Sequence, residues 1–191
     1  LEMEVQRRSD RAEDLLNRLQ SQPLNDEEQL SANLLRAMVS FNFDHLECAI
    51  QQLGELKDLP QPMLAPYRPT QASCLLYTGQ TQRARSMLEL LVSWADCQQQ
   101  FHLKLVGWYR LAQIHFYQGD WQQCSKVLQL GVEFANQHQL TTDPIFDSYY
   151  RLQAELAIYQ GQADQADYWL QQGTPLTENR GDYWQLPYLS H

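Results

Sequence analysis

The apolar positions along the chain recur every three or four residues, which is the spacing of helices that bury one face. Val and Ile are scarce and never alternate with polar residues over a useful length, so no strand is expected. The pattern therefore predicts an all-α chain. Its clearest helices are expected at residues 69–78, 101–118, 120–137, 144–160 and 162–172.

Capping residues and prolines mark where other helices begin and end. Asn25 with Glu28, and Asp44 with Glu47, have the spacing of capping boxes. Asp143 before Pro144 predicts another helix start. The helix after Asn25 is expected to bury Leu30, Leu34, Leu35, Met38 and Phe41. A loop is expected at the prolines 60, 62, 66 and 69, because proline removes backbone donors.

The first stretch, up to about residue 19, mixes arginines with acidic residues. The simplest interpretation is the charged outer face of a helix, with ion pairs at three- and four-residue spacing. A nucleic-acid-binding arm is the alternative. The acids distributed through the stretch disfavour that alternative, because basic arms usually lack them.

A short motif recurs along the chain. A tyrosine stands two residues before Gly79, Gly119 and Gly161, and these glycines are 40 and 42 residues apart. A small residue follows each glycine after five positions, and the full set of small positions is Ala12, Ala49, Ala84, Cys124 and Ala166. Glycine can take a positive φ in a turn, and a small residue lets two helices approach closely. A fixed period of this size indicates a helical solenoid.

The repeat predicts one domain over residues 1–191, with about 4.5 helix pairs. Its expected segments are 1–22 (the second helix of a partial repeat), 23–59, 60–99, 100–140, 141–175, and 176–191 (the start of a further repeat). We therefore expect a fragment of a longer protein. A solenoid cut between repeats leaves apolar surface uncovered, so a homodimer through that surface is expected.

The best-preserved copy of the motif resembles a tetratricopeptide repeat. The matching positions are Trp108, Leu111, Ala112, Gly119, Asp120, Cys124 and Leu128. The resemblance implies an α-solenoid of antiparallel helix pairs with a superhelical twist. Loose repeats of about 40 residues, mainly over 70–190, also resemble the helical sensor region of the large ATP-binding LuxR-type (maltose-activator-like) transcription regulators.

The second resemblance implies a signal-sensing or protein-interaction domain of a cytoplasmic bacterial transcription regulator. Its partner would be a small effector or a protein. An ATPase module and a helix-turn-helix flank this region in that family, but this chain has neither a phosphate-binding loop nor a basic recognition helix. The alternative is a tetratricopeptide scaffold without a transcriptional role. An enzyme would need a catalytic cluster, and the sequence offers none.

In tetratricopeptide packing, the first helix of each pair lines a concave surface. The resemblance therefore implies a groove for a ligand or partner. Its expected residues are Tyr77, Tyr109, Gln113, Phe116, Tyr117, Arg151, Glu155 and Tyr159, with Ser73 and Ser148 beside them. Tyrosine and arginine offer ring faces and directional hydrogen bonds to a bound peptide or small molecule. The alternative is that each tyrosine only packs over its own turn.

Composition narrows the chemistry further. The net charge of −9 argues against contact with a nucleic-acid backbone, and no apolar run is long enough to cross a membrane. Cys48, Cys74, Cys97 and Cys124 form no paired motif and are expected to be reduced and buried, which suits a cytosol. The histidines are isolated in sequence, so neither zinc nor another cofactor is expected.

Overall fold

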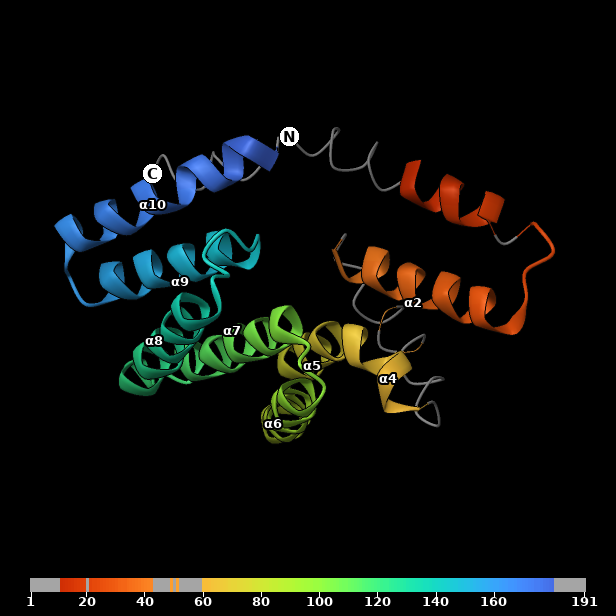
Figure 1. Ribbon diagram of the computed structural model, residues 1–191, viewed down its shortest axis with the longest axis horizontal. Helices are drawn as coiled ribbons and strands as arrows, with labels where there is room; N and C mark the ends of the chain where they lie inside the picture. The colour runs from red at the N-terminus through yellow and green to blue at the C-terminus, as the bar shows by residue number, and fades with distance from the viewer. Residues whose placement is uncertain (1–10, 20, 43–48, 50, 52–59, 181–191) are drawn as a thin grey trace. The chain divides into compact units, whose positions relative to one another are not determined.

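The computed structural model describes residues 11–19, 21–42, 49, 51 and 60–180 (Figure 1). The second predicted capping box, Cys48 and the segment after residue 180 lie outside the described residues. By its internal contacts the chain divides into two compact units, Leu1–Ala84 and Arg85–His191. The single domain over residues 1–191 remains a prediction.

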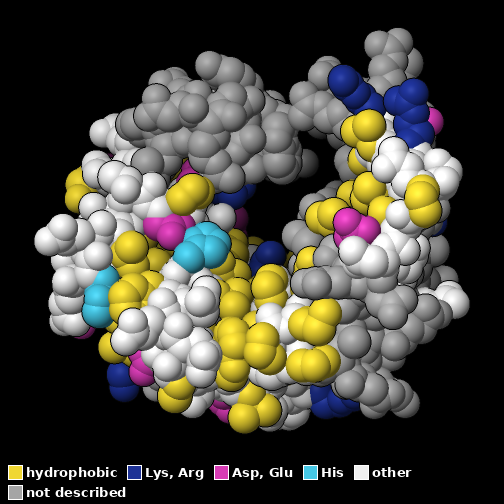
Figure 2. Space-filling view, turned by 45° about the vertical axis from the view of Figure 1, so that its right-hand side comes forward, with side chains coloured by type: hydrophobic (Ala, Val, Ile, Leu, Met, Phe, Trp, Pro, Cys, Tyr) yellow, Lys and Arg dark blue, Asp and Glu magenta, His cyan; other side chains and the backbone are white. Residues whose placement is uncertain are grey.

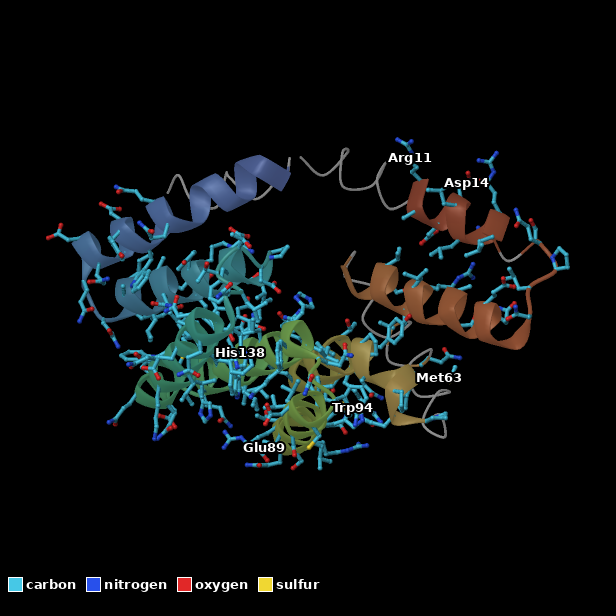
Figure 3. All side chains as sticks on the ribbon, in the orientation of Figure 1. Arg11, Asp14, Met63, Glu89, Trp94 and His138 are labelled. Atoms are coloured by element: carbon cyan, nitrogen blue, oxygen red, sulfur yellow. The ribbon has the colours of Figure 1, made fainter. Side chains whose placement is uncertain are left out.

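The first unit begins with a helix at 11–19 and continues with α2 (Asp26–Asn42). The predicted capping box of α2 is confirmed, since the Asn25 N–H donates to Glu28 Oε2 at 3.0 Å and the Glu28 N–H donates to Asn25 Oδ1 at 2.9 Å. An ion pair of 3.7 Å joins Arg18 to Asp14, as the charge pattern predicts. Asp14 and Arg11 point away from α2 (Figure 3).

Of the side chains in the predicted apolar stripe of α2, the structure describes only that of Leu35. Leu35, expected in the core, is 45% exposed, whereas Ala32 and Ala37 are fully buried. These two alanines lie about 140° apart around the helix, so α2 is covered on more than one side. Helical spacing alone does not show which sides of a helix its neighbours cover.

The loop predicted at the four prolines is wrong, because this segment is helical. Residues 60–77 form α4 (Gln61–Leu64), a 3₁₀ turn (Ala65–Tyr67) and α5 (Arg68–Tyr77). Each of these three elements carries a proline in its first turn. The first-turn N–H groups have no intrahelical acceptor, so proline loses nothing there. Leu64 and Ala65 are buried, and packing therefore holds the segment in place.

The clearest helices are confirmed. α6 (Thr81–Cys97) crosses the boundary between the units, and the second unit continues with α7 (Phe101–Tyr117), α8 (Trp121–His138), α9 (Ile145–Tyr159) and α10 (Ala163–Arg180). α7 packs on α8, and α9 packs on α10, in two hairpins (Figure 1). α9 also contacts α7 and α8 of the preceding pair. No strand occurs in the part of the chain that the structure describes.

The three glycine turns have the same geometry. Gly79, Gly119 and Gly161 have backbone φ angles of 75°, 73° and 71°, which residues with a Cβ atom rarely adopt. The residue after each glycine donates its N–H to a carbonyl of the preceding helix, as in a Schellman motif. Asp120 then caps α8, accepting from the Gln123 N–H at 3.3 Å. The turn chemistry predicted from the repeat is confirmed.

The small positions also have their predicted role. Ala49, Ala84, Cys124 and Ala166 are all buried. A leucine stands four residues after each of the last three small positions. Leu88 and Leu128 are each 1% exposed, whereas Leu170 is half-buried. Ala12 is only half-buried. The repeat residues are therefore mainly the residues of helix packing.

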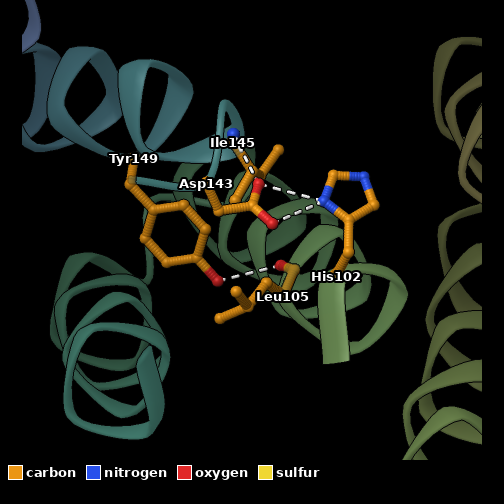
Figure 4. A network of polar contacts seen from close by, with 5 residues as sticks. All are labelled: His102, Leu105, Asp143, Ile145 and Tyr149. Atoms are coloured by element: carbon orange, nitrogen blue, oxygen red, sulfur yellow. Dashed lines mark hydrogen bonds and ion pairs between the residues drawn. The ribbon is translucent and has the colours of Figure 1, made fainter. Parts of the chain in front are cut away.

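One tyrosine joins three helices of the second unit. Tyr149 of α9 is fully buried, and its hydroxyl donates to the Leu105 carbonyl of α7 at 2.9 Å (Figure 4). Its ring lies against Gly131 of α8, where a Cβ would be 2.5 Å from Tyr149 Cε1. Any side chain at Gly131 would occupy the space of the ring. Burial raises the pKa of Tyr149, so its hydroxyl keeps the proton that it donates.

The predicted end of the last helix at Gly173 is wrong, since α10 continues through Pro175 to Arg180. Gly173 is buried against α9, where a Cβ would meet Asp147 Oδ1 at 3.5 Å and Tyr150 Cβ at 3.6 Å. The glycine thus lies where the two helices approach closely. Packing against α9 outweighs the low helix propensity of glycine and proline.

These two glycines give a matched pair of substitutions. Gly131→Ala should destabilise the protein by about 1–3 kcal/mol, because the buried Tyr149 ring must move. Gly173→Ala should be neutral or stabilise by up to about 1 kcal/mol, because its Cβ would make ordinary contacts and alanine favours a helix. Urea unfolding of both variants measures the difference. Equal free energies of unfolding for the two variants would contradict this packing.

Candidate functional site

A network of half-buried polar side chains lies along α7. Gln113 Nε2 donates to the Tyr109 hydroxyl at 3.0 Å, and Arg110 Nη1 donates to Gln113 Oε1 at 2.8 Å. The Arg110 guanidinium also lies 5.5 Å from the centre of the Tyr109 ring. The three- and four-residue spacing on one helix brings these groups together. They form a half-buried surface rich in hydrogen-bond donors.

The facing helix α9 extends this network. Arg151 Nη2 lies 3.3 Å from Oδ2 of the buried Asp147, and Ser148 shares a hydrogen bond with Tyr109. Burial raises the pKa of Tyr109, and the charges of Arg110 and Arg151 oppose this rise. Both guanidinium groups therefore act on one hydroxyl. We call Tyr109, Arg110, Gln113, Ser148, Arg151 and Glu155 the polar cluster.

Two donors of the polar cluster are incompletely bonded. The Nε atoms of Arg110 and Arg151 are buried and have no hydrogen-bond acceptor among the described residues. A buried donor without an acceptor costs about 1–3 kcal/mol. Burial also raises the pKa of Glu155, and Arg151 opposes this rise, although much of the Glu155 side chain is exposed. Only the accessible N–H groups of the two half-buried guanidinium groups could donate to oxygen atoms of a bound molecule.

Aromatic residues gather beside the polar cluster, at the two glycine turns. The Phe116 ring lies 5.7 Å from the Tyr117 ring and 5.3 Å from the Tyr159 ring. Trp121 lies 6.1 Å from Tyr159. Tyr117 is 57% exposed and Tyr159 is 63% exposed. These four residues, the turn aromatics, present ring surface that extends across two consecutive hairpins.

The predicted groove residues are thus placed differently from one another. Phe116 is buried in the core and supports the tyrosines from below. Tyr77 and Ser73 belong to the first unit, where Tyr77 is 60% exposed and Ser73 is buried, its hydroxyl donating to the Pro69 carbonyl at 3.0 Å. The other predicted residues divide between the polar cluster and the turn aromatics. Their role in binding remains a prediction.

Sequence reasoning missed Arg110. The signal was available, because Arg151 follows Arg110 after 41 residues, within the 40–42-residue period of the turn glycines. High exposure of a large side chain does not by itself identify the polar cluster or the turn aromatics, because Leu90 and Ile158 belong to neither group and are 71% and 61% exposed. Figure 2 shows hydrophobic side chains in several exposed groups on one face, with polar side chains between them.

A cavity of about 380 Å³ lies on another side of the second unit, where α8, α9 and α10 meet. Its lining residues are Ser125, Leu128, Gln129, Val132, Gln153, Leu156, Ala157, Gln160, Gln162, Gln165 and Trp169. One of these lining residues is Trp169. It is half-buried and stacks on Tyr150 with ring centres 6.0 Å apart.

His102 is isolated in sequence but not in space. His102 Nδ1 lies 2.9 and 2.8 Å from the two carboxylate oxygens of Asp143, which also accepts from the Ile145 N–H at 2.9 Å (Figure 4). Asp143 therefore caps the start of α9, as predicted, and links it to the start of α7. No group of three or more potential metal ligands occurs among the described residues.

No described helix is both long and apolar enough to span a membrane.

Comparison with known proteins supports the fold. A crystal structure from Podospora anserina, described as a kinesin light chain of nearly identical TPR-like repeats, matches with a TM-score of 0.60. The match has 18% sequence identity and covers 93% of this chain and 89% of that chain. No family model and no curated protein matches. The fold is thus an all-α solenoid of tetratricopeptide-like helix pairs, as predicted.

The described cysteines differ in burial. Cys74 and Cys124 are buried, and burial raises the pKa of their thiols to about 11 and about 12. Cys97 was predicted to be buried but is exposed, because it lies in the last turn of α6. The thiols of the three described cysteines are therefore expected to differ in reactivity.

Maleimide labelling near neutral pH should modify Cys97 at least about tenfold faster than Cys74 and Cys124, because only thiolates react and buried thiols stay protonated. Peptide mapping by mass spectrometry measures each site separately. In denaturant the rates should converge. Fast labelling of Cys124 in the folded protein would contradict its place in the core.

Proposed function

We propose that this chain is a protein-interaction scaffold that binds a segment of a partner protein across α7 and α9. The polar cluster and the turn aromatics would form the binding surface. The observation that carries the proposal is that Arg110 of α7 and Arg151 of α9, both half-buried, share one polar cluster on helices that also carry the exposed rings of Tyr117 and Tyr159. Carbonyl or carboxylate oxygens of a partner would accept hydrogen bonds from the accessible N–H groups of the two guanidinium groups.

The neighbouring aromatic residues support the same proposal. Tyr117 and Tyr159 offer large, exposed rings about two helical turns beyond Arg110 and Arg151 on the same two helices. Tyrosine and arginine are enriched among residues that contribute most to protein interfaces, since both combine apolar area with hydrogen bonding. A peptide could place a backbone carbonyl on an arginine and an apolar side chain on the turn aromatics.

A narrower form of the proposal is the signal-sensing domain of a cytoplasmic bacterial LuxR-type regulator. It is supported only by the loose 40-residue period and the repeat residues between 70 and 190. The encoding reading frame tests it. Sequence for an ATPase module before this segment and a helix-turn-helix after it would support a regulator, and the absence of both would leave the general scaffold.

The general proposal can be tested without knowing the partner. Random peptides displayed on phage would be selected against the protein, and the affinities of enriched peptides would be measured by calorimetry. Arg110→Gln should weaken binding by about 10- to 100-fold, because it removes a charged donor worth about 1.5–3 kcal/mol.

The matched control is Lys126→Gln, which removes one positive charge from an exposed position on α8. It should change affinity by less than about threefold, since exposed charges act weakly at a distance. Equal effects of the two substitutions would place the binding surface elsewhere. A selection that enriches no peptide would contradict a peptide-binding scaffold.

A further inference from the structure

The cavity between α8, α9 and α10 has an unusual lining. Five glutamine side chains and one serine surround it, and none of the described residues that line it is ionisable. Gln153 lies on α9, Gln160 directly follows the end of α9, and Gln165 lies on α10. Each amide offers both donors and acceptors. The rim can therefore pair with either kind of group on a ligand.

The floor of the cavity is apolar. Leu128, Leu156 and Ala157 are buried beneath it, and the half-buried Trp169 forms part of the wall. Trp169 is held by stacking on Tyr150 and by an edge contact with Tyr168 at 4.8 Å. A fixed aromatic ring beside several amides suits a flat molecule with polar edges.

We propose that this cavity binds an uncharged small molecule that carries amide or hydroxyl groups around a flat apolar face. The volume of about 380 Å³ lies at the lower end of the range for small-molecule sites, roughly 300–1,000 Å³. A charged ligand would lose hydration without gaining an opposite charge from the lining. The site is separate from the proposed partner surface, because it uses another side of α9.

The residues of α9 show this separation. Gln153, Leu156 and Gln160 recur at three- and four-residue intervals and line the cavity. Arg151 and Glu155 recur at a four-residue interval and belong to the polar cluster. A ligand in the cavity would contact residues of two consecutive hairpins, and would therefore stabilise their packing through its binding energy.

Three fragments of nearly the same shape test the proposal. Benzamide is neutral, benzoate is an anion and benzamidine is a cation at neutral pH. Each would be titrated into the isotopically labelled protein while the indole N–H signals are followed, with Trp169→Phe used to assign the relevant signal. Benzamide should shift the Trp169 signal but not that of Trp121, and should bind at least about tenfold more tightly than either ion.

Substitutions at the rim reverse the charge preference. Gln153→Glu should weaken the binding of benzamide and strengthen the binding of benzamidine. Gln165→Glu changes an exposed rim position and gives the same test with less risk to folding. Gln122→Glu places the same charge on an exposed part of α8 outside the cavity and should change neither affinity. Equal binding of the three fragments, or no shift of the Trp169 signal, would overturn the proposal.

Discussion

The packing of Tyr149 is the contact on which the second unit depends. Its ring fills the space above Gly131 of α8, and its hydroxyl bonds the Leu105 carbonyl of α7 at 2.9 Å. The hydrogen bond is fully buried, so breaking it would leave polar groups without water. The contact fixes how one hairpin follows the previous one, and α9 can therefore present two different surfaces at defined positions.

Those two surfaces differ in chemistry. Toward α7, α9 contributes Arg151 and Glu155 to a cluster with unsatisfied charged donors. Toward α8 and α10, it contributes amides to a cavity whose described lining carries no charge. The repeat residues contribute no polar group to the cluster or to the cavity, although the repeat residue Leu128 forms part of the apolar cavity floor. In this solenoid, small residues and leucines form the scaffold, while residues between them on the same helices supply the binding groups.

The sequence predicted the scaffold well, because its features have local causes. Turn glycines, the Asn25–Glu28 capping box and the buried small positions follow from backbone geometry and helix spacing. The errors arise where packing decides. Prolines in first turns allowed helix where a loop was expected, and contact with α9 carried α10 past Gly173. The cavity depends on three helices that meet, and its glutamines resemble ordinary surface residues in sequence.

The most direct test of the account is hydrogen exchange of the Tyr149→Phe variant, followed by mass spectrometry. Phenylalanine keeps the ring but removes the hydrogen bond to α7, at a cost of about 1 kcal/mol. If Tyr149 joins the three helices, the amides of α7, α8 and α9 should lose protection together, by roughly fivefold. Loss of protection confined to α9, or no loss at all, would contradict this role of Tyr149.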